Sequence, residues 1–177
     1  MRMFYRLRQL WEALYARPTP PDLALAQGVL APPLIALFLR LQPGEQAHSL
    51  RILCQLLEQG ENHPDLLAAA LLHDVGKSRY PLHVWERVVI VLGKAVLPKQ
   101  ARRWGQAQPR GWQRPFVIAE QHPVWGAEMA GQAGASPLTV SLIRNHQEAP
   151  PPLVYRAEPP QIENLLLHRL QGLDDES

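Results

Sequence analysis

Prolines divide this sequence into short segments in which apolar residues recur at helical spacing. The 177 residues include 18 prolines, close to double the usual ~5%, and groups of them stand at positions 18–21, 32–33, 150–152 and 159–160. Proline lacks the backbone N–H that a helix interior or a central strand requires, so such groups punctuate helices. No alternating polar and apolar run of useful length indicates a β-strand. The sequence therefore predicts an all-α protein.

The length and composition fit a compact helical fold. A chain of 177 residues buries a sizeable core without disulfides. The single cysteine, Cys54, lies among leucines, so we expect a small buried residue in a reducing compartment and a cytoplasmic protein. The net charge of only +2 does not indicate a nucleic-acid partner. We expect an N-terminal helical extension over residues 1–33 and the main helical domain over residues 34–177.

The first 14 residues have the pattern of a basic amphipathic helix. Charges interrupt this segment too often for the apolar core of a signal peptide. Two roles stay open: its apolar side packs on the domain, or it makes a weak contact with an anionic membrane surface, its arginines facing the head groups. The apolar run at residues 34–41 is far shorter than the ~20 residues that span a bilayer.

The adjacent residues His73 and Asp74 are the strongest functional signal. Neighbours on a helix point about 100° apart, so an imidazole and a carboxylate can flank one pocket while the leucines at 71–72 turn toward a core. Gly76 is predicted to end this helix in the left-handed conformation, which leaves Lys77 free to reach an anion held by a metal. The alternative is an ordinary helix end, with the aspartate in solvent.

Other candidate metal ligands also lie at predicted helices: His48, His122, His146 and Asp174. His48 is near the start of an amphipathic helix with apolar residues at 50, 53, 56 and 57. His122 precedes Pro123, so we expect it in a helix cap or first turn. His146 ends a helix that begins at residues 136–137, and Asp174 ends the last apolar periodic stretch. Asp175 is an alternative to Asp174, because residues 174–176 also fit a solvated acidic tail.

With its ligands in this order, the sequence resembles the HD-domain superfamily of metal-dependent phosphohydrolases over roughly residues 34–175. The histidines within 121–128 and 144–148 are similar to those of the two-metal branch that includes the HD-GYP cyclic-dinucleotide phosphodiesterases. The resemblance implies a compact HD-type bundle that binds metal over residues 34–177. It assigns one ion to His48, His73, Asp74 and Asp174, and a second ion, bridged by Asp74, to His122 and His146.

The resemblance also implies a reaction. Imidazole and carboxylate ligands together suit Fe, Mn, Zn or Co. A pair of such ions activates a hydroxide and stabilises a phosphoryl displacement. Asp74 and Lys77 are then the catalytic residues, with Lys77 neutralising a non-bridging phosphate oxygen. The implied substrate is a small nucleotide-like phosphomonoester or phosphodiester, and the oligomeric state stays open.

The sequence departs from the HD-GYP pattern beyond His146. Gln147 stands where that pattern has a second histidine, and no Gly-Tyr-Pro turn follows Glu148. We therefore do not expect cyclic di-GMP as the substrate. Gly44, four residues before His48, does not support a carboxylate ligand for a third metal. The alternative function is a non-catalytic HD-fold module that regulates or binds a partner, since a fold alone does not determine function.

The segment between the His-Asp pair and His122 admits several interpretations. Residues 84–97 are expected to form a core helix or a lid, or a short contact with a membrane surface. Residues 99–114 contain five basic side chains and two tryptophans, and no acidic residue occurs from 87 to 119. These basic residues are expected either to contact an anionic substrate or to lie in a solvated loop. His63, His83 and His168 are placed outside the site.

Overall fold

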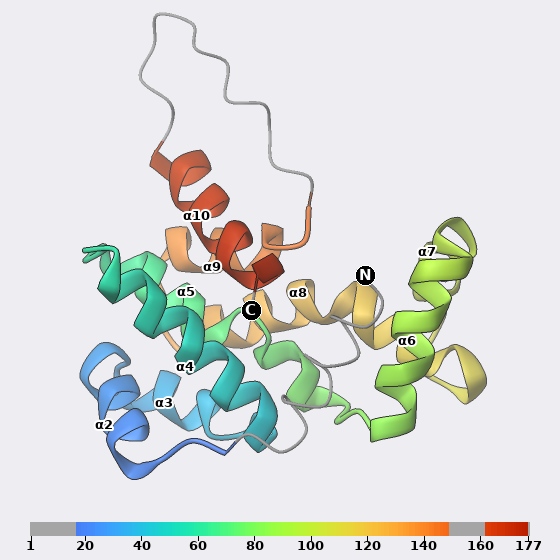
Figure 1. Cartoon of the computed structure of the whole chain (residues 1–177), viewed down its shortest axis with the longest axis horizontal. Helices are drawn as coiled ribbons and strands as arrows, with labels where there is room; N and C mark the ends of the chain where they lie inside the picture. The colour runs from blue at the N-terminus through green and yellow to red at the C-terminus, as the bar shows by residue number, and fades with distance from the viewer. Residues whose placement is uncertain (1–16, 149–161, 177) are drawn as a thin grey trace, which may run out of the picture.

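The structure is a computed structural model that describes residues 17–148 and 162–176. Within these ranges every regular element is a helix (Figure 1). The α-helices are α2 (Pro20–Val29), α3 (Pro32–Phe38), α4 (Pro43–Glu58), α5 (Pro64–Leu72), α6 (Val84–Val96), α7 (Pro98–Gly105), α8 (Arg114–Gln132), α9 (Pro137–Asn145) and α10 (Ile162–Glu176); the short 3-10 helices are η1 (Val75–Arg79) and η2 (Gly111–Gln113). The predicted all-α fold is confirmed. The amphipathic helix predicted at the N-terminus lies outside the described residues.

Prolines stand at the first or second position of most of these helices, where a missing N–H costs nothing. The start of α9 shows how local and tertiary contacts combine. The Ser136 hydroxyl accepts a hydrogen bond from the backbone N–H of Thr139 at 3.0 Å. The hydroxyl of Thr139 donates to Asp65 of α5 at 2.8 Å. The cap therefore also joins α9 to α5.

Helix α5 lies at the centre of the core. All its residues from 66 to 72 are buried, and α4, α9, α10, α2 and α3 pack around it. Leu71 and Leu72 turn into this core, as predicted. Ala26 and Leu30, at α2, belong to the same apolar cluster. Cys54 of α4 is only partly buried, which corrects the prediction of a buried residue.

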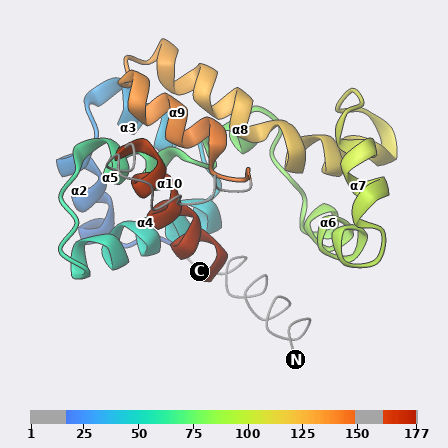
Figure 2. The ribbon, with the colours of Figure 1, turned by 90° about the horizontal axis from the view of Figure 1, so that it is seen from above.

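Helices α6 and α7 form an arm at one end of the molecule, away from α2–α5 (Figures 1 and 2). The apolar side chains of α6 do not belong to the core cluster, so the core-helix interpretation of this segment is wrong. Residues 98–105 form a helix, in place of the solvated loop that was one expectation. Trp104 packs α7 against α8, because the centroid of its ring lies 5.0 Å from that of Phe116 on α8. No helix in the described ranges is long and apolar enough to cross a membrane.

Candidate metal centre

His73 and Asp74 lie where α5 ends and η1 begins, and both are buried. The predicted left-handed cap at Gly76 is wrong: the chain continues into η1, and Gly76 has no positive φ. Glycine is needed here for a different reason. A Cβ on Gly76 would lie 2.0 Å from the carbonyl oxygen of His122 and 2.7 Å from the backbone nitrogen of Gly126. Its absence lets η1 approach α8 and brings Asp74 beside His122.

His122 lies in the middle of α8, which corrects the predicted position in a cap or first turn. The helix begins instead at Arg114, and Pro123 is tolerated inside it. A proline costs a helix one backbone hydrogen bond, but α8 packs along its length on η1, α9 and α7, and such packing supplies most helix stability in proteins. His122 is 1% exposed.

The remaining predicted ligands come from three further helices. His48 projects from α4 and Asp174 from the last turn of α10, and the two side chains meet with Nε2 of His48 2.9 Å from Oδ1 of Asp174. The same carboxylate oxygen lies 3.5 Å from Nε2 of His73. His146 follows the last residue of α9, as predicted, and is buried. All six predicted metal ligands therefore converge around the end of α5.

Backbone carbonyls orient the three buried imidazoles. The Nδ1 atoms of His73, His122 and His146 lie 2.9, 3.0 and 2.8 Å from carbonyl oxygens of their own helices. A proton on each Nδ1 leaves the Nε2 lone pair free, which is the arrangement typical of metal-bound histidines. In the described part of the chain these three buried Nε2 atoms have no hydrogen-bond partner.

The free Nε2 atoms surround the carboxylate of Asp74. Oδ1 lies 3.1 Å from Nε2 of His122 and 4.0 Å from that of His146, while Oδ2 lies 3.6 Å from Nε2 of His73. Lone pairs and a carboxylate repel one another unless a proton or a cation lies between them. These orphaned atoms thus fit a bound cation.

The pKa of His73 also indicates that positive charge is favoured beside the carboxylates, whereas His146 stays neutral. Burial alone lowers the pKa of His73, but the carboxylates of Asp74 and Asp174 outweigh it and raise that pKa to about 9. Burial, with the nearby rings of His73 and His122, lowers the pKa of His146 to about 3. Without a metal, a proton on His73 and the ammonium of Lys77 balance the two carboxylates.

The ligand atoms form two groups that share one residue. His48, His73 and Asp74 make one group, and Asp74, His122 and His146 make the other. Within each group, ligand atoms lie within 4.8 Å of one another. Both groups contain imidazole nitrogen and carboxylate oxygen, a donor set that suits divalent transition metals.

Lys77 is not free, contrary to the prediction. Its ammonium Nζ lies 2.5 Å from Oδ2 of Asp74, because η1 turns the side chain back toward the cluster. This contact contributes to holding the pKa of Asp74 well below its usual range, although burial alone raises it. Lys77 also lines a pocket next to the cluster, so its ammonium is close to any anion bound there.

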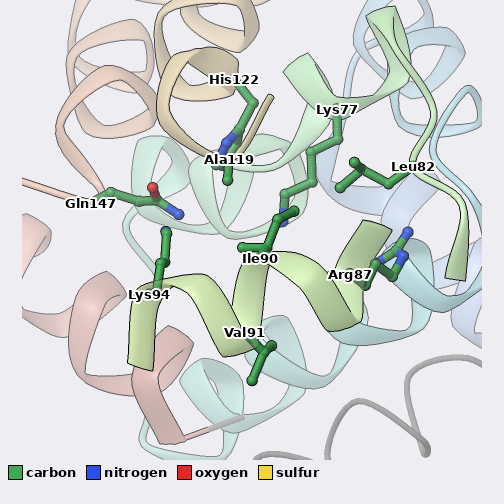
Figure 3. Close-up of a pocket in the computed structure, with 9 residues that line it drawn as sticks. All are labelled: Lys77, Leu82, Arg87, Ile90, Val91, Lys94, Ala119, His122 and Gln147. Carbon is green, nitrogen blue, oxygen red and sulfur yellow. The ribbon is translucent and has the colours of Figure 1, made fainter. Parts of the chain in front are cut away.

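Two adjoining pockets lie beside the cluster. The inner pocket, about 170 Å³, lies between His122 and Lys77 on one side and Arg87 and Lys94 of α6 on the other (Figure 3). The outer pocket, about 550 Å³, shares Lys94 and Gln147 with the inner one. Arg102 of α7 and Arg144 of α9 add positive charge to its wall, while Glu120 and Glu148 add negative charge.

Sequence reasoning missed several residues of the site. Lys94 and Gln147 line both pockets, although sequence reasoning gave Lys94 no role and treated Gln147 only as the replacement of a histidine. Gln171 of α10 donates to the carbonyls of Asn145 and Glu148, at 3.1 and 2.6 Å, and so holds the chain on either side of His146. No sequence signal marks Gln171, because its partners are backbone atoms.

A helical fold that brings four histidines and two aspartates together is compatible with a metal-binding domain. The family model of the HD domain matches residues 46–171, and the chain belongs to this family. The matched range contains His48, His73, Asp74, His122 and His146, and Asp174 follows shortly after it. HD domains bind divalent metals, and their superfamily generally comprises metal-dependent phosphohydrolases. No curated protein and no solved structure matches the chain.

Proposed function

We propose that this protein is a phosphohydrolase that binds two divalent transition-metal ions and acts on a nucleotide-like phosphomonoester or phosphodiester. One observation carries the proposal: three buried Nε2 lone pairs converge on the carboxylate of Asp74 beside a pocket with cationic walls. An inert core would place hydrogen-bond partners on such buried atoms, because leaving them unpaired is costly.

The two ligand groups give each ion its own set of residues. His48, His73 and Asp174 would hold one ion together with Asp74, and His122 and His146 would hold the other, also together with Asp74. Fe, Mn, Zn and Co all suit these donors. Bound ions of this kind supply Lewis acidity and lower the pKa of water to the neutral range.

The chain itself contributes positioning and charge. Asp74 keeps the two ligand groups in register, because its two oxygens face different imidazoles. Lys77 is placed to transfer its contact from Asp74 to a phosphate oxygen, which neutralises charge on the reacting group. Both side chains are therefore the catalytic residues of the proposal.

The outer pocket supports a substrate larger than phosphate. Lys94, Arg102 and Arg144 have no carboxylate within ion-pair distance among the described residues. Burial lowers the pKa of Lys94, although Glu120 acts in the opposite direction, and an anion bound beside Lys94 would favour its charged form. A nucleotide with a second anionic group fits this charge distribution.

The test combines metal analysis with turnover on protein purified without chelators or a histidine tag. Elemental analysis should give about two transition-metal ions per chain, as for two-metal hydrolases. Phosphate release should be measured on a panel of nucleotides and generic phosphoesters. Asp74→Asn should lose both metal and turnover, whereas Glu128→Gln, an exposed carboxylate on the helix of His122, should keep both. Retained metal and turnover in Asp74→Asn would contradict the proposal.

One observation favours a second candidate, a non-catalytic regulatory module. The ammonium of Lys77 already neutralises Asp74 at 2.5 Å, an internal ion pair that does not need a metal. Such a module would bind nucleotide without releasing phosphate. Equilibrium binding measured beside turnover distinguishes the two functions, because only the hydrolase converts the ligand that it binds.

A further inference from the structure

Helix α6 has two faces of different character. Arg87 and Lys94 lie on the face that lines the inner pocket (Figure 3). Because residues of a helix advance by about 100°, Trp85, Leu92 and Val96 fall on the opposite face. These three side chains are 58, 45 and 69% exposed. The pocket face also carries Ile90 and Val91, so α6 has apolar side chains on both faces, and those on the opposite face are left exposed.

Further apolar side chains are exposed at both ends of α6. Val84 at its start and Leu97 just after it are 53 and 42% exposed. We call the five side chains Val84, Trp85, Leu92, Val96 and Leu97 the outer stripe. It lies on the arm that projects from the end of the molecule (Figures 1 and 2). Apolar side chains gathered on an exposed element mark an interaction surface.

The arm that carries the outer stripe is positively charged. The sequence contains no acidic residue from position 87 to 119. On α7, Lys99 and Arg103 are exposed and Arg102 lines the outer pocket, and no carboxylate of the described residues pairs with any of the three. The arm therefore exposes apolar side chains and unpaired cations. Its complementary partner is a surface that offers apolar groups and anions.

We propose that the outer stripe docks on an anionic lipid membrane, with α6 lying in the plane of the interface. A basic helix that exposes tryptophan and aliphatic side chains binds such surfaces by burying its apolar face while the neighbouring cations attract acidic head groups. The 13 residues of α6 are too few to cross the bilayer, so this contact is peripheral.

A second copy of the chain is the poorer occupant. A two-fold dimer formed by the outer stripe would bring the same basic arm of both copies together. Lys99 and Arg103 would then face like charges, which is unfavourable. An anionic membrane has no such conflict.

The test is co-sedimentation of the full chain with vesicles of phosphatidylglycerol and phosphatidylcholine, and with vesicles of phosphatidylcholine alone. We expect binding to the anionic vesicles that weakens with salt. The double variant Trp85→Ser/Leu92→Ser should reduce the partition coefficient by at least about tenfold, because each side chain loses its transfer free energy. The matched control is Leu39→Ser, which removes a side chain that is 50% exposed near α3; it should bind like the original chain.

A charge variant separates the two parts of the proposed contact. Lys99→Gln/Arg103→Gln should weaken binding to anionic vesicles and leave residual binding to neutral ones unchanged. Circular dichroism and thermal melting establish that each variant is folded. Equal vesicle binding by the stripe variant and the original chain would overturn the proposal. A second result would also overturn it: the original chain forms a stable dimer by light scattering, the stripe variant is a monomer, and neither protein binds vesicles. Neither measurement depends on the proposed hydrolase activity.

Discussion

Replacing Gly76 with alanine tests how the metal centre is assembled. The new methyl carbon would lie 2.0 Å from the His122 carbonyl oxygen and 2.7 Å from the Gly126 nitrogen. Both are backbone atoms of α8, so neither can rotate away as a side chain would. Helix η1 must therefore move from α8 by more than 1 Å to restore ordinary contacts of about 3.4 Å.

This movement has a cost for stability and a larger one for metal binding. Overpacking of this kind costs about 1–3 kcal/mol, which lowers the Tm of a chain of this size by roughly 3–10 °C. Asp74 moves with η1, away from Nε2 of His122 at 3.1 Å. We therefore expect the group of Asp74, His122 and His146 to lose its ion before the group containing His48 does.

The assay is a thermal melt together with metal content after titration with a weak chelator. The control is Gly28→Ala, because a Cβ at Gly28 in α2 meets nothing within 4 Å. That variant should gain about 0.5–1 kcal/mol, since alanine favours the helix over glycine. A Gly76→Ala protein with unchanged Tm and full metal content would refute the close-approach reasoning.

Three further predictions address the metal, the pocket and the arm. Removing metal with a chelator should lower the Tm by roughly 5–10 °C, because a ligand at 100 times its Kd adds about 2.7 kcal/mol to the free energy of unfolding. Adding Mn²⁺ or Zn²⁺ should restore the Tm in a melting assay. A Tm that the chelator does not change would argue against a bound ion. Lys94→Gln should raise KM for phosphorylated substrates with little change in kcat. The control, Arg40→Gln on the exposed surface beyond α3, should alter neither constant. Equal KM values for Lys94→Gln and the original chain would show that Lys94 does not bind substrate. Arg114→Gln should destabilise the chain by about 1.5–3 kcal/mol in denaturant titration, because Glu86, 2% exposed, loses its ion pair. Burial alone raises the pKa of Glu86, but Arg114 and the backbone N–H of His83 together outweigh it and lower that pKa. The stabilisation is therefore present above the ordinary glutamate pKa and is lost as pH falls through the folded value. A difference between variant and original chain that persists undiminished in acid would contradict this assignment.

The sequence by itself determined the helices and the chemical identity of the site. Proline at a helix start and the Ser136 cap act through atoms only a few residues away, so helix starts could be predicted from local patterns. The residue types of the proposed ligands and their order along the chain were also evident from the sequence alone. Their meeting in space was an expectation taken from the resemblance, since Asp174 and His48 stand 126 positions apart.

Tertiary structure decided everything that depends on how helices approach one another. The sequence predicted a left-handed Gly76, a capping His122 and a free Lys77, because local rules contain no information about α8 packing against η1. That packing puts His122 inside a long helix, makes glycine necessary at 76 for contact, and turns Lys77 onto Asp74. The orientation of α6 was also decided by tertiary structure. The sequence predicts which side chains share a face of this helix, but only its packing on α7 and α8 determines which face lines the pocket. Propensity and spacing act over a turn or two, whereas side-chain direction follows from which surfaces the whole chain can bury together.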